Sequence, residues 1–235
     1  MQCNKKSSTK AAAPCFDFTK TELMSKLADI RNDYNKGSLE KKALNADPFQ
    51  QFNQWMKEAI HAECNEPTAV TLATVNAEQQ PNCRIVLLKD VCDGGFVFFT
   101  NYKSEKGLEL ANTNYAALNF FWPELERQVR IRGTVTKVSE QQSDEYFQSR
   151  PRESQLGAWA SAQSEVVKDG QELQANYKAL EKQYKGKTIP RPIHWGGYIV
   201  KAKSIEFWQG RANRMHDRYQ YTVSDAKWSI KQLAP

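Results

Sequence analysis

The spacing of apolar residues changes along the chain, and its first part has the period of a helix. Within residues 18–34, apolar side chains recur three or four positions apart, which predicts an amphipathic helix. A second helix is expected after Asp47, which can cap it, with Pro48 at its first position. The two buried stripes would be Leu23, Met24, Leu27 and Ile30 in the first helix, and Phe49, Phe52, Trp55, Met56 and Ile60 in the second.

From Thr68 onward the pattern alternates and is rich in β-branched and aromatic residues, which is typical of strands. Short polar turns separate the apolar runs, so neighbouring strands should pair antiparallel. The predicted strands are 68–75, 82–91, 96–100, 115–122, 127–138, 196–202, 204–210, 217–223 and 227–233. Helices are predicted at 104–110, where Ser104 can act as the cap, and at 139–149, 152–160 and 169–184.

These elements predict a mostly β protein with α additions, in which an antiparallel sheet closes into a barrel flanked by helices. Closure removes the exposed edges that an open antiparallel sheet would carry. No linker or internal repeat interrupts the pattern, so we expect one domain over residues 17–235, with a helical N-terminal part at 17–66. Residues 1–16 are basic, which predicts a flexible tail; the alternative is a transit peptide.

Composition narrows the class of protein. Hydrophobic residues make up 40% of the chain, and no apolar run approaches the ~18 residues of a membrane span. The five cysteines contain no CxxC, and the three histidines lie far apart, so neither a disulfide framework nor a metal site is indicated. We therefore expect a protein of the reducing cytosol, without metal and without a membrane partner.

The net charge of +6 leaves two kinds of partner open, a nucleic acid or small anionic ligands. Lysines are scattered, whereas arginines gather in short clusters beside Gly, Trp, Ser and Gln. Such clusters are typical of pockets in which guanidinium groups form bidentate hydrogen bonds with phosphates.

Two clusters lie in the first half of the sheet. In "RIVLLK", Arg84 and Lys89 should leave opposite faces of one strand; the alternative is a solvated strand end. In "FFTNYKSEKG" (98–107), backbone N–H groups at a helix start could attract phosphate, although an ordinary capped helix has the same pattern.

Two further clusters lie in the second half of the chain. In "RQVRIRG", Gln128, Arg130 and Arg132 share one strand face. Gln128 could form hydrogen bonds with the edge of a heterocycle, or the face could simply be charged and exposed. In "YFQSRPRES", Tyr146 and Arg150 are four residues apart and Ser154 is four further on. These three could converge on a phosphate, or could lie on an ordinary helix surface broken by a proline.

The densest cluster is "FWQGRANRMHDR" (207–218). Arg214, His216 and Arg218 alternate, so all three should face one side of a strand that begins there. Because like charges on one face repel each other, this arrangement predicts an anion among them.

The motifs resemble the pyridoxamine/pyridoxine 5′-phosphate oxidase family in the family's own order. The matching segments cover roughly residues 31–235, and they are "RIVLLK", "FFTN", "RQVRIRG", "YFQSRPRESQLGAWAS", "WGGY", "EFWQG", "NRMHDR" and the closing "LAP". The resemblance implies a split β-barrel that binds FMN and works as a homodimer with the flavin at the subunit interface. It also implies oxidation of pyridoxine or pyridoxamine 5′-phosphate to pyridoxal 5′-phosphate, with O₂ as acceptor and H₂O₂ as product.

The resemblance also implies roles for individual residues. Arg214 and His216 would be catalytic, with His216 the better proton acceptor and Arg214 an orienting group. A lid would include Arg31 and Tyr34. The expected FMN contacts are Arg84, Ile85, Val86, Leu87, Leu88, Lys89, Phe99, Thr100, Lys106, Gln128, Gln163, Ser164, Trp208 and Arg218. The expected substrate contacts are Lys89, Tyr146, Arg150, Ser154, Arg214, Met215 and His216, together with Arg31 and Tyr34 from the lid.

Two positions depart from the family pattern. Glu105 stands where the family carries an arginine before Lys106, and Gln232 replaces an arginine before the closing "LAP". An acid beside the FMN phosphate should weaken cofactor binding. Two rival functions remain at this point, a non-catalytic binder of FMN or pyridoxal phosphate and a basic nucleic-acid module.

Overall fold

The computed structural model describes residues 27–167 and 169–235, and they divide into two units, residues 27–33 and residues 34–235. In the first unit a single helical turn covers residues 27–29, and Ile30 has already left it. The predicted helix over 18–34 is therefore wrong at its C-terminal end, while residues 18–26 lie outside the described part. In the second unit Tyr34 packs its ring edge-on against Trp208, 5.6 Å between centroids, a tertiary contact that local periodicity does not encode.

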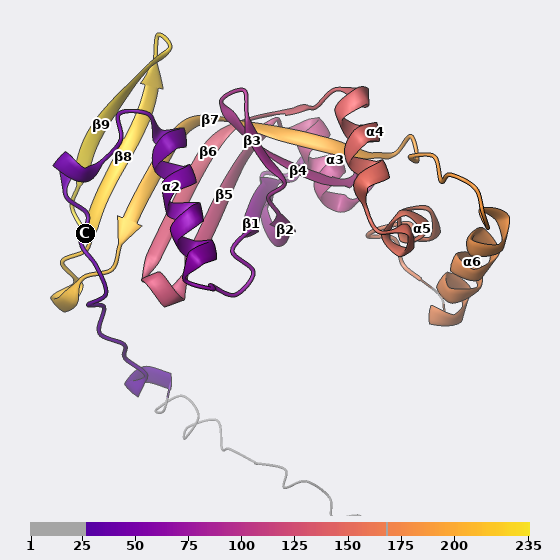
Figure 1. Cartoon of the computed structure of the whole chain (residues 1–235), viewed down its shortest axis with the longest axis horizontal. Coiled ribbons are helices and arrows are strands. Elements are labelled where there is room, and N and C mark those ends of the chain that lie inside the picture. The colour runs from indigo at the N-terminus through magenta and orange to yellow at the C-terminus, as the bar shows by residue number, and fades with distance from the viewer. Residues whose placement is uncertain (1–26, 168) are drawn as a thin grey trace, which may run out of the picture. The chain divides into compact units, whose positions relative to one another are not determined.

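Residues 34–235 form a nine-stranded antiparallel sheet with helices around it (Figure 1). The strands pair in the order β2-β1-β5-β6-β7-β4-β3, and β8 continues from β7 to β9. Their bounds are β1 Ala69–Val75, β2 Pro81–Leu87, β3 Asp90–Cys92, β4 Gly95–Asn101, β5 Tyr115–Trp122, β6 Arg127–Lys137, β7 Trp195–Gln209, β8 Asp217–Ser224 and β9 Lys227–Leu233. The helices are α2 Pro48–His61, α3 Glu105–Asn112, α4 Glu140–Ser149, α5 Arg152–Ala160 and α6 Gly170–Gln183, with short 3₁₀ turns at Lys41–Ala43, Pro123–Leu125 and Ala212–Arg214.

The mostly antiparallel sheet with added helices is confirmed. Its closure stays a prediction, because within the described residues the hydrogen-bonded ladder ends at β2 on one side and β3 on the other.

Two strands differ from the pattern in the sequence. The predicted strand 82–91 breaks at Leu88 and Lys89, whose N–H groups donate to Thr68 and Val97 respectively, so the chain changes partner from β1 to β4. The two predicted strands 196–202 and 204–210 are one continuous strand, β7. The register between β6 and β7 shifts at Arg132 and Gly133, which pair with Ser204 and Ala202, so Lys203 of β7 is the extra residue of a bulge. A Cβ on Gly133 would lie 2.0 Å from the Lys201 carbonyl oxygen.

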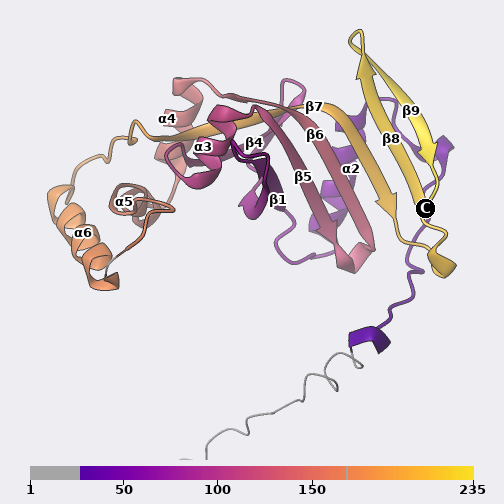
Figure 2. The same ribbon diagram turned by 180° about the vertical axis from the view of Figure 1, so that it is seen from behind.

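The main core lies between α2 and one face of the sheet. Phe52 of α2 is fully buried against Phe96 and Phe120, with ring centroids 4.9 and 5.1 Å away, and Trp55 meets Phe207 edge-on at 5.2 Å. Figure 2 shows β5 and β6 from the opposite side, with α2 behind them. The stripe predicted for this helix is therefore confirmed at Phe52 and Trp55, whereas Ile60 is exposed.

A second, smaller core forms where the helices after β6 meet the start of β7. It contains Phe147, Leu156, Ile189 and Trp195. This cluster fixes α4 and α5 beside β4 and thereby builds one wall of the cavity described below.

The described residues contain no helix that is both long and apolar enough to cross a membrane. Cys64, Cys83 and Cys92 are free thiols. The cytosolic location expected from the cysteines stays a prediction.

Candidate active site

A cavity of about 650 Å³ lies between β2, β4 and the α4–α5 junction, a size typical of small-molecule and cofactor sites. Fourteen residues line this cavity, and twelve of them were expected at the site. The other two are Pro151 and Trp195, for which the sequence predicted no role. The lining residues are Arg84, Ile85, Val86, Leu87, Lys89, Phe99, Thr100, Lys106, Tyr146, Arg150, Pro151, Ser154, Gln163 and Trp195.

The cavity wall is cationic. Arg84, Lys89, Lys106 and Arg150 line it, and none of the described lining residues is Asp or Glu. Arg84 and Lys89 were expected on opposite faces of one strand, and this is wrong, because β2 ends at Leu87 and Lys89 turns to the same cavity. Four positive groups around one cavity make it an anion site.

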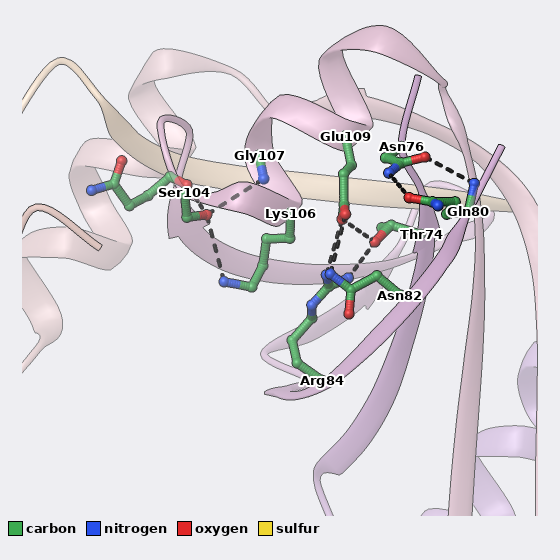
Figure 3. A network of polar contacts seen from close by, with 10 residues as sticks. Thr74, Asn76, Gln80, Asn82, Arg84, Ser104, Lys106, Gly107 and Glu109 are labelled. Carbon is green, nitrogen blue, oxygen red and sulfur yellow. Dashed lines mark hydrogen bonds and ion pairs between the residues drawn. The ribbon is translucent and has the colours of Figure 1, made fainter. Parts of the chain in front are cut away.

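Arg84 is held in place by a buried carboxylate, as Figure 3 shows. Glu109 of α3 accepts hydrogen bonds from Arg84 Nη2 at 2.9 Å, Thr74 Oγ1 at 2.5 Å and Asn82 Nδ2 at 3.2 Å. Burial alone would raise the pKa of Glu109, but these three donors and the charge of Arg84 lower it below its ordinary value. Glu109 thus stays ionised and fixes α3 to β1 and β2.

Lys106 lies buried in the first turn of α3, with its Nζ 3.5 Å from Ser104 Oγ. Ser104 caps this helix, as predicted, and accepts from the Gly107 N–H. Burial lowers the pKa of Lys106, and the charge of Arg84 lowers it further. Two neighbouring cations that disfavour each other's charge would both be stabilised by a bound phosphate.

The α4–α5 junction brings together the three residues predicted to converge. Tyr146 lies in the last turn of α4, Arg150 follows that helix, and Ser154 lies in the first turn of α5. The Nη1 atom of Arg150 is buried and has no hydrogen-bond partner among the described residues. Since buried donors are normally paired, this unpaired guanidinium nitrogen is the strongest sign that the cavity takes an anion.

A second cluster forms at the other end of β7. The rings of Trp208 and His216 lie 4.7 Å apart, and Tyr34 is edge-on to both. The Arg211 N–H donates to His216 Nδ1 at 3.1 Å, so this nitrogen is unprotonated in the neutral ring and Nε2 carries the proton. Gln128 of β6 pairs with Trp208 and belongs to this cluster. Below, the C-terminal cluster means Tyr34, Gln128, Trp208 and residues 211–218.

The expected alternation of Arg214, His216 and Arg218 on one strand face is wrong. Arg214 lies in a 3₁₀ turn with a left-handed φ of 60°, and β8 begins only at Asp217. Arg218 donates to the buried Glu206 at 2.9 Å, and Glu206 also pairs with Arg130 at 2.6 Å. A carboxylate of the chain itself therefore balances part of the charge that the sequence assigned to a bound anion.

The two clusters cannot meet within one chain. Trp195 and Trp208 are thirteen residues apart on β7, which corresponds to about 40 Å along an extended strand. Figure 1 shows β7 running from the α4–α5 side of the sheet to β8. No C-terminal cluster residue lines the cavity.

The other expected contacts are placed as follows. Met215 is 68% exposed, and Leu88 is buried behind the cavity wall without lining it. Ser164 follows Gln163 in a loop with a positive φ of 74°. Arg31 belongs to the unit of residues 27–33, so its relation to the cavity stays a prediction.

Sequence reasoning missed three residues that shape these clusters. Trp195 and Glu206 were part of the matched segments "WGGY" and "EFWQG" but received no role, and Glu109 carried no signal beyond being an acid in a helix pattern. Their partners come from distant parts of the chain, so only the fold reveals them.

Family models match nearly all of the described second unit. Residues 56–184 match the model described as "Pyridoxamine 5′-phosphate oxidase", and residues 195–235 match "Pyridoxine 5′-phosphate oxidase C-terminal dimerisation region". The cavity residues fall within these segments, mostly in the first, and the C-terminal cluster falls mostly in the second, with Tyr34 outside both.

Relatives and a solved structure agree with these models. The pyridoxine/pyridoxamine 5′-phosphate oxidase of Actinobacillus succinogenes is 54% identical, covering 89% of this chain and 99% of the relative, and that of Cyanothece sp. is 53% identical, covering 89% and 98%. The structure of PhzG from Burkholderia lata 383 in complex with tetrahydrophenazine-1-carboxylic acid superposes with a TM-score of 0.81 at 27% identity, covering 87% of this chain and all of PhzG. The chain belongs to the pyridoxine/pyridoxamine 5′-phosphate oxidase family.

Proposed function

We infer that this chain oxidises pyridoxine 5′-phosphate or pyridoxamine 5′-phosphate to pyridoxal 5′-phosphate, with O₂ as electron acceptor and H₂O₂ as product. The observation that carries this inference is the cavity, where the predicted cationic and aromatic residues meet around an unpaired buried arginine. Curated relatives more than 50% identical over almost their whole length carry the name of this activity.

The cofactor that fits the cavity is FMN. Arg84 and Lys106 offer two cations at the start of α3, which suit a phosphate, and Thr100 adds a hydroxyl. Ile85, Val86 and Leu87 give an apolar edge along which a flavin ring can lie. When bound, FMN would supply a two-electron acceptor for the hydride at C4′ of the substrate, with O₂ as the final acceptor. Ser164 and Leu88 would be supporting contacts.

The substrate phosphate would be held at the α4–α5 junction. Arg150 would donate to it through its free Nη1, together with the hydroxyls of Tyr146 and Ser154. Lys89, on the opposite side of the cavity, would contact both substrate and cofactor. These groups bind and orient the substrate so that its C4′ carbon faces the flavin.

The C-terminal cluster would supply the groups that handle the proton lost from the alcohol or amine. His216 is the proposed proton acceptor, a role that requires its Nδ1 to release the hydrogen bond from the Arg211 N–H, and Arg214 orients the pyridine ring, since an arginine is essentially always protonated. Trp208, Gln128 and Arg218 would contact the flavin.

Because the two clusters are about 40 Å apart along β7, we propose a homodimer in which the C-terminal cluster of one protomer completes the cavity of its partner. A two-fold axis makes two such composite sites at once. The match of residues 195–235 to a dimerisation region supports this arrangement.

The finer architecture follows the same proposal. The described residues of 17–235 would belong to one FMN-binding split-barrel domain, and the tail expected at residues 1–16 lies outside the described part. Arg31 and Tyr34 would belong to the lid expected within residues 17–66, of which residues 17–26 also lie outside that part. A nucleic-acid module is the weaker alternative, because Arg84, Lys89, Lys106 and Arg150 line one cavity, which suits a small anionic ligand.

Anaerobic flavin reduction tests the proposed activity. The purified protein is loaded with FMN, pyridoxine 5′-phosphate is added without oxygen, and the flavin absorbance is followed. We expect the yellow colour to bleach and to return when air is admitted. Bound FMN that does not bleach with either pyridoxine or pyridoxamine 5′-phosphate would replace the oxidase by a non-catalytic binder.

A further inference from the structure

Trp195 lines the cavity, and the proposed mechanism gives it no role. It is 7% exposed and begins β7. The guanidinium carbon of Arg150 lies 4.5 Å from the centroid of its ring, within the range of a cation–π interaction.

Arg150 has few other groups to hold it. It forms no ion pair within residues 27–167 and 169–235, and its Nη1 has no hydrogen-bond partner there. The groups that face it are aromatic, namely Trp195 and the ring of Phe147 at 5.6 Å. Burial lowers the pKa of Arg150, and Tyr146 opposes this shift. When no anion is bound, the ring faces of Trp195 and Phe147 are the main groups that compensate for the lost hydration of the Arg150 guanidinium.

The ring of Trp195 is itself firmly placed. It stacks nearly parallel to Phe99, 5.6 Å away at 13°, and to Tyr146, 6.2 Å away at 7°. Its backbone carbonyl accepts from Arg191 Nη1 at 2.7 Å, and its N–H donates to the Pro192 carbonyl at 2.9 Å. A side chain fixed by β-ladder, hydrogen bonds and stacking can serve as a rigid support for a long, flexible arginine.

We propose that Trp195 is a positioning residue, whose ring face holds the Arg150 guanidinium so that its unpaired nitrogen points at the substrate phosphate. The proposal rests on the proposed function for the identity of the phosphate ester, and on the geometry alone for the anion. Without Trp195, Arg150 must be ordered by the phosphate itself, and that ordering reduces affinity while the chemical step stays unchanged.

The test compares Trp195→Leu, which removes the π face, with Trp195→Phe, which keeps a smaller one. Trp55→Phe is the matched control, because Arg127 also lies 4.5 Å from the Trp55 ring, away from the cavity. With FMN-loaded protein we expect Trp195→Leu to raise KM for pyridoxine 5′-phosphate about tenfold, with kcat within about twofold. Trp195→Phe should raise KM about threefold or less, and Trp55→Phe should leave it unchanged.

Inorganic phosphate as a competitive inhibitor isolates the anion contact. Its inhibition constant should rise in Trp195→Leu by the same factor as KM. In an Arg150→Ala background, Trp195→Leu should add nothing further, because the interaction is already gone. An equal increase with and without Arg150, or a fall in kcat at constant KM, would overturn the proposal.

Binding of pyridoxal 5′-phosphate to oxidised, FMN-loaded protein, measured by calorimetry, separates this inference from the proposed activity. No turnover occurs in that experiment, so a protein that fails the bleaching test can still show the tenfold loss in Trp195→Leu. Equal affinity in wild type and Trp195→Leu, with the melting temperature retained, would overturn the positioning role even if the oxidase activity is established.

Discussion

At one end of β7, Trp195 stands inside a cavity whose walls come from β2, β4, α3, α4 and α5. At the other end, Trp208 lies with Tyr34 and His216 in a cluster of rings outside that cavity. Both ends contain a buried carboxylate paired with arginine, Glu109 with Arg84 at the first end and Glu206 with Arg130 and Arg218 at the second. Among the described residues, only the first end also has a buried arginine nitrogen, Arg150 Nη1, without a hydrogen-bond partner. This difference supports the proposal that the first end receives the anion and the second covers a ligand held by another protomer.

The largest effect on activity should come from variants that remove one residue from each end of β7, placed in different protomers of the dimer. Arg150→Ala and Arg214→Ala should each keep the fold and lose about 10- to 150-fold in kcat/KM, because each removes a charged hydrogen bond worth roughly 1.5–3 kcal/mol. Co-expressed, the two variants should recover about a quarter of wild-type activity, because half of the dimers are mixed and each mixed dimer has one intact site.

Steady-state kinetics on the purified mixed dimer, with tags selecting one copy of each variant, gives the cleanest measurement. Unmixed variants combined just before the assay are the control. Activity of the mixed dimer no higher than that of the single variants would mean that Arg150 and Arg214 of the same chain share a site. Full activity of Arg214→Ala by itself would mean that Arg214 takes no part.

A smaller effect, on FMN affinity and on the stability of the FMN-free protein, should depend on pH and should involve only the cavity end of β7. Burial, helped by Arg84, places the pKa of Lys106 below its ordinary 10.5. The FMN phosphate needs the protonated amine, so FMN affinity should be full below this lowered pKa and should fall as the pH rises through it. The unfolded chain binds the proton more tightly, so the stability of the FMN-free protein should instead rise with pH between the lowered pKa and 10.5.

Lys106→Met should remove both trends and weaken FMN at neutral pH about tenfold. Quenching of flavin fluorescence gives the affinity, and thermal unfolding of the cofactor-free protein gives the stability. The assignment is wrong if the alkaline loss of FMN affinity persists unchanged in this variant.

The same two ends show what the sequence alone could predict. The cavity residues were identifiable because "RIVLLK", "FFTN" and "YFQSRPRES" are local motifs, and short turns gave the antiparallel sheet. The turn before Asp217 was not, because it places two non-glycine residues, Asn213 and Arg214, in the left-handed region. The break at Leu88 was not, because it depends on partners from other strands. Glu109 and Glu206 were missed for the same reason, since a buried carboxylate acquires its role only from the arginines that the fold brings to it.

The smallest expected effect concerns Glu105, the family departure at the cavity end. Glu105 is exposed in the first turn of α3, where its carboxylate suits the helix dipole, and its charge acts on Lys106. Because exposed charges are screened, Glu105→Arg should tighten FMN only about two- to fivefold, and less at high salt. Glu140→Arg, at the same exposed first-turn position of α4, is the matched control for the dipole. A titration in which both variants behave alike, or in which Glu105→Arg leaves FMN affinity unchanged, would show that Glu105 does not act on the cofactor phosphate.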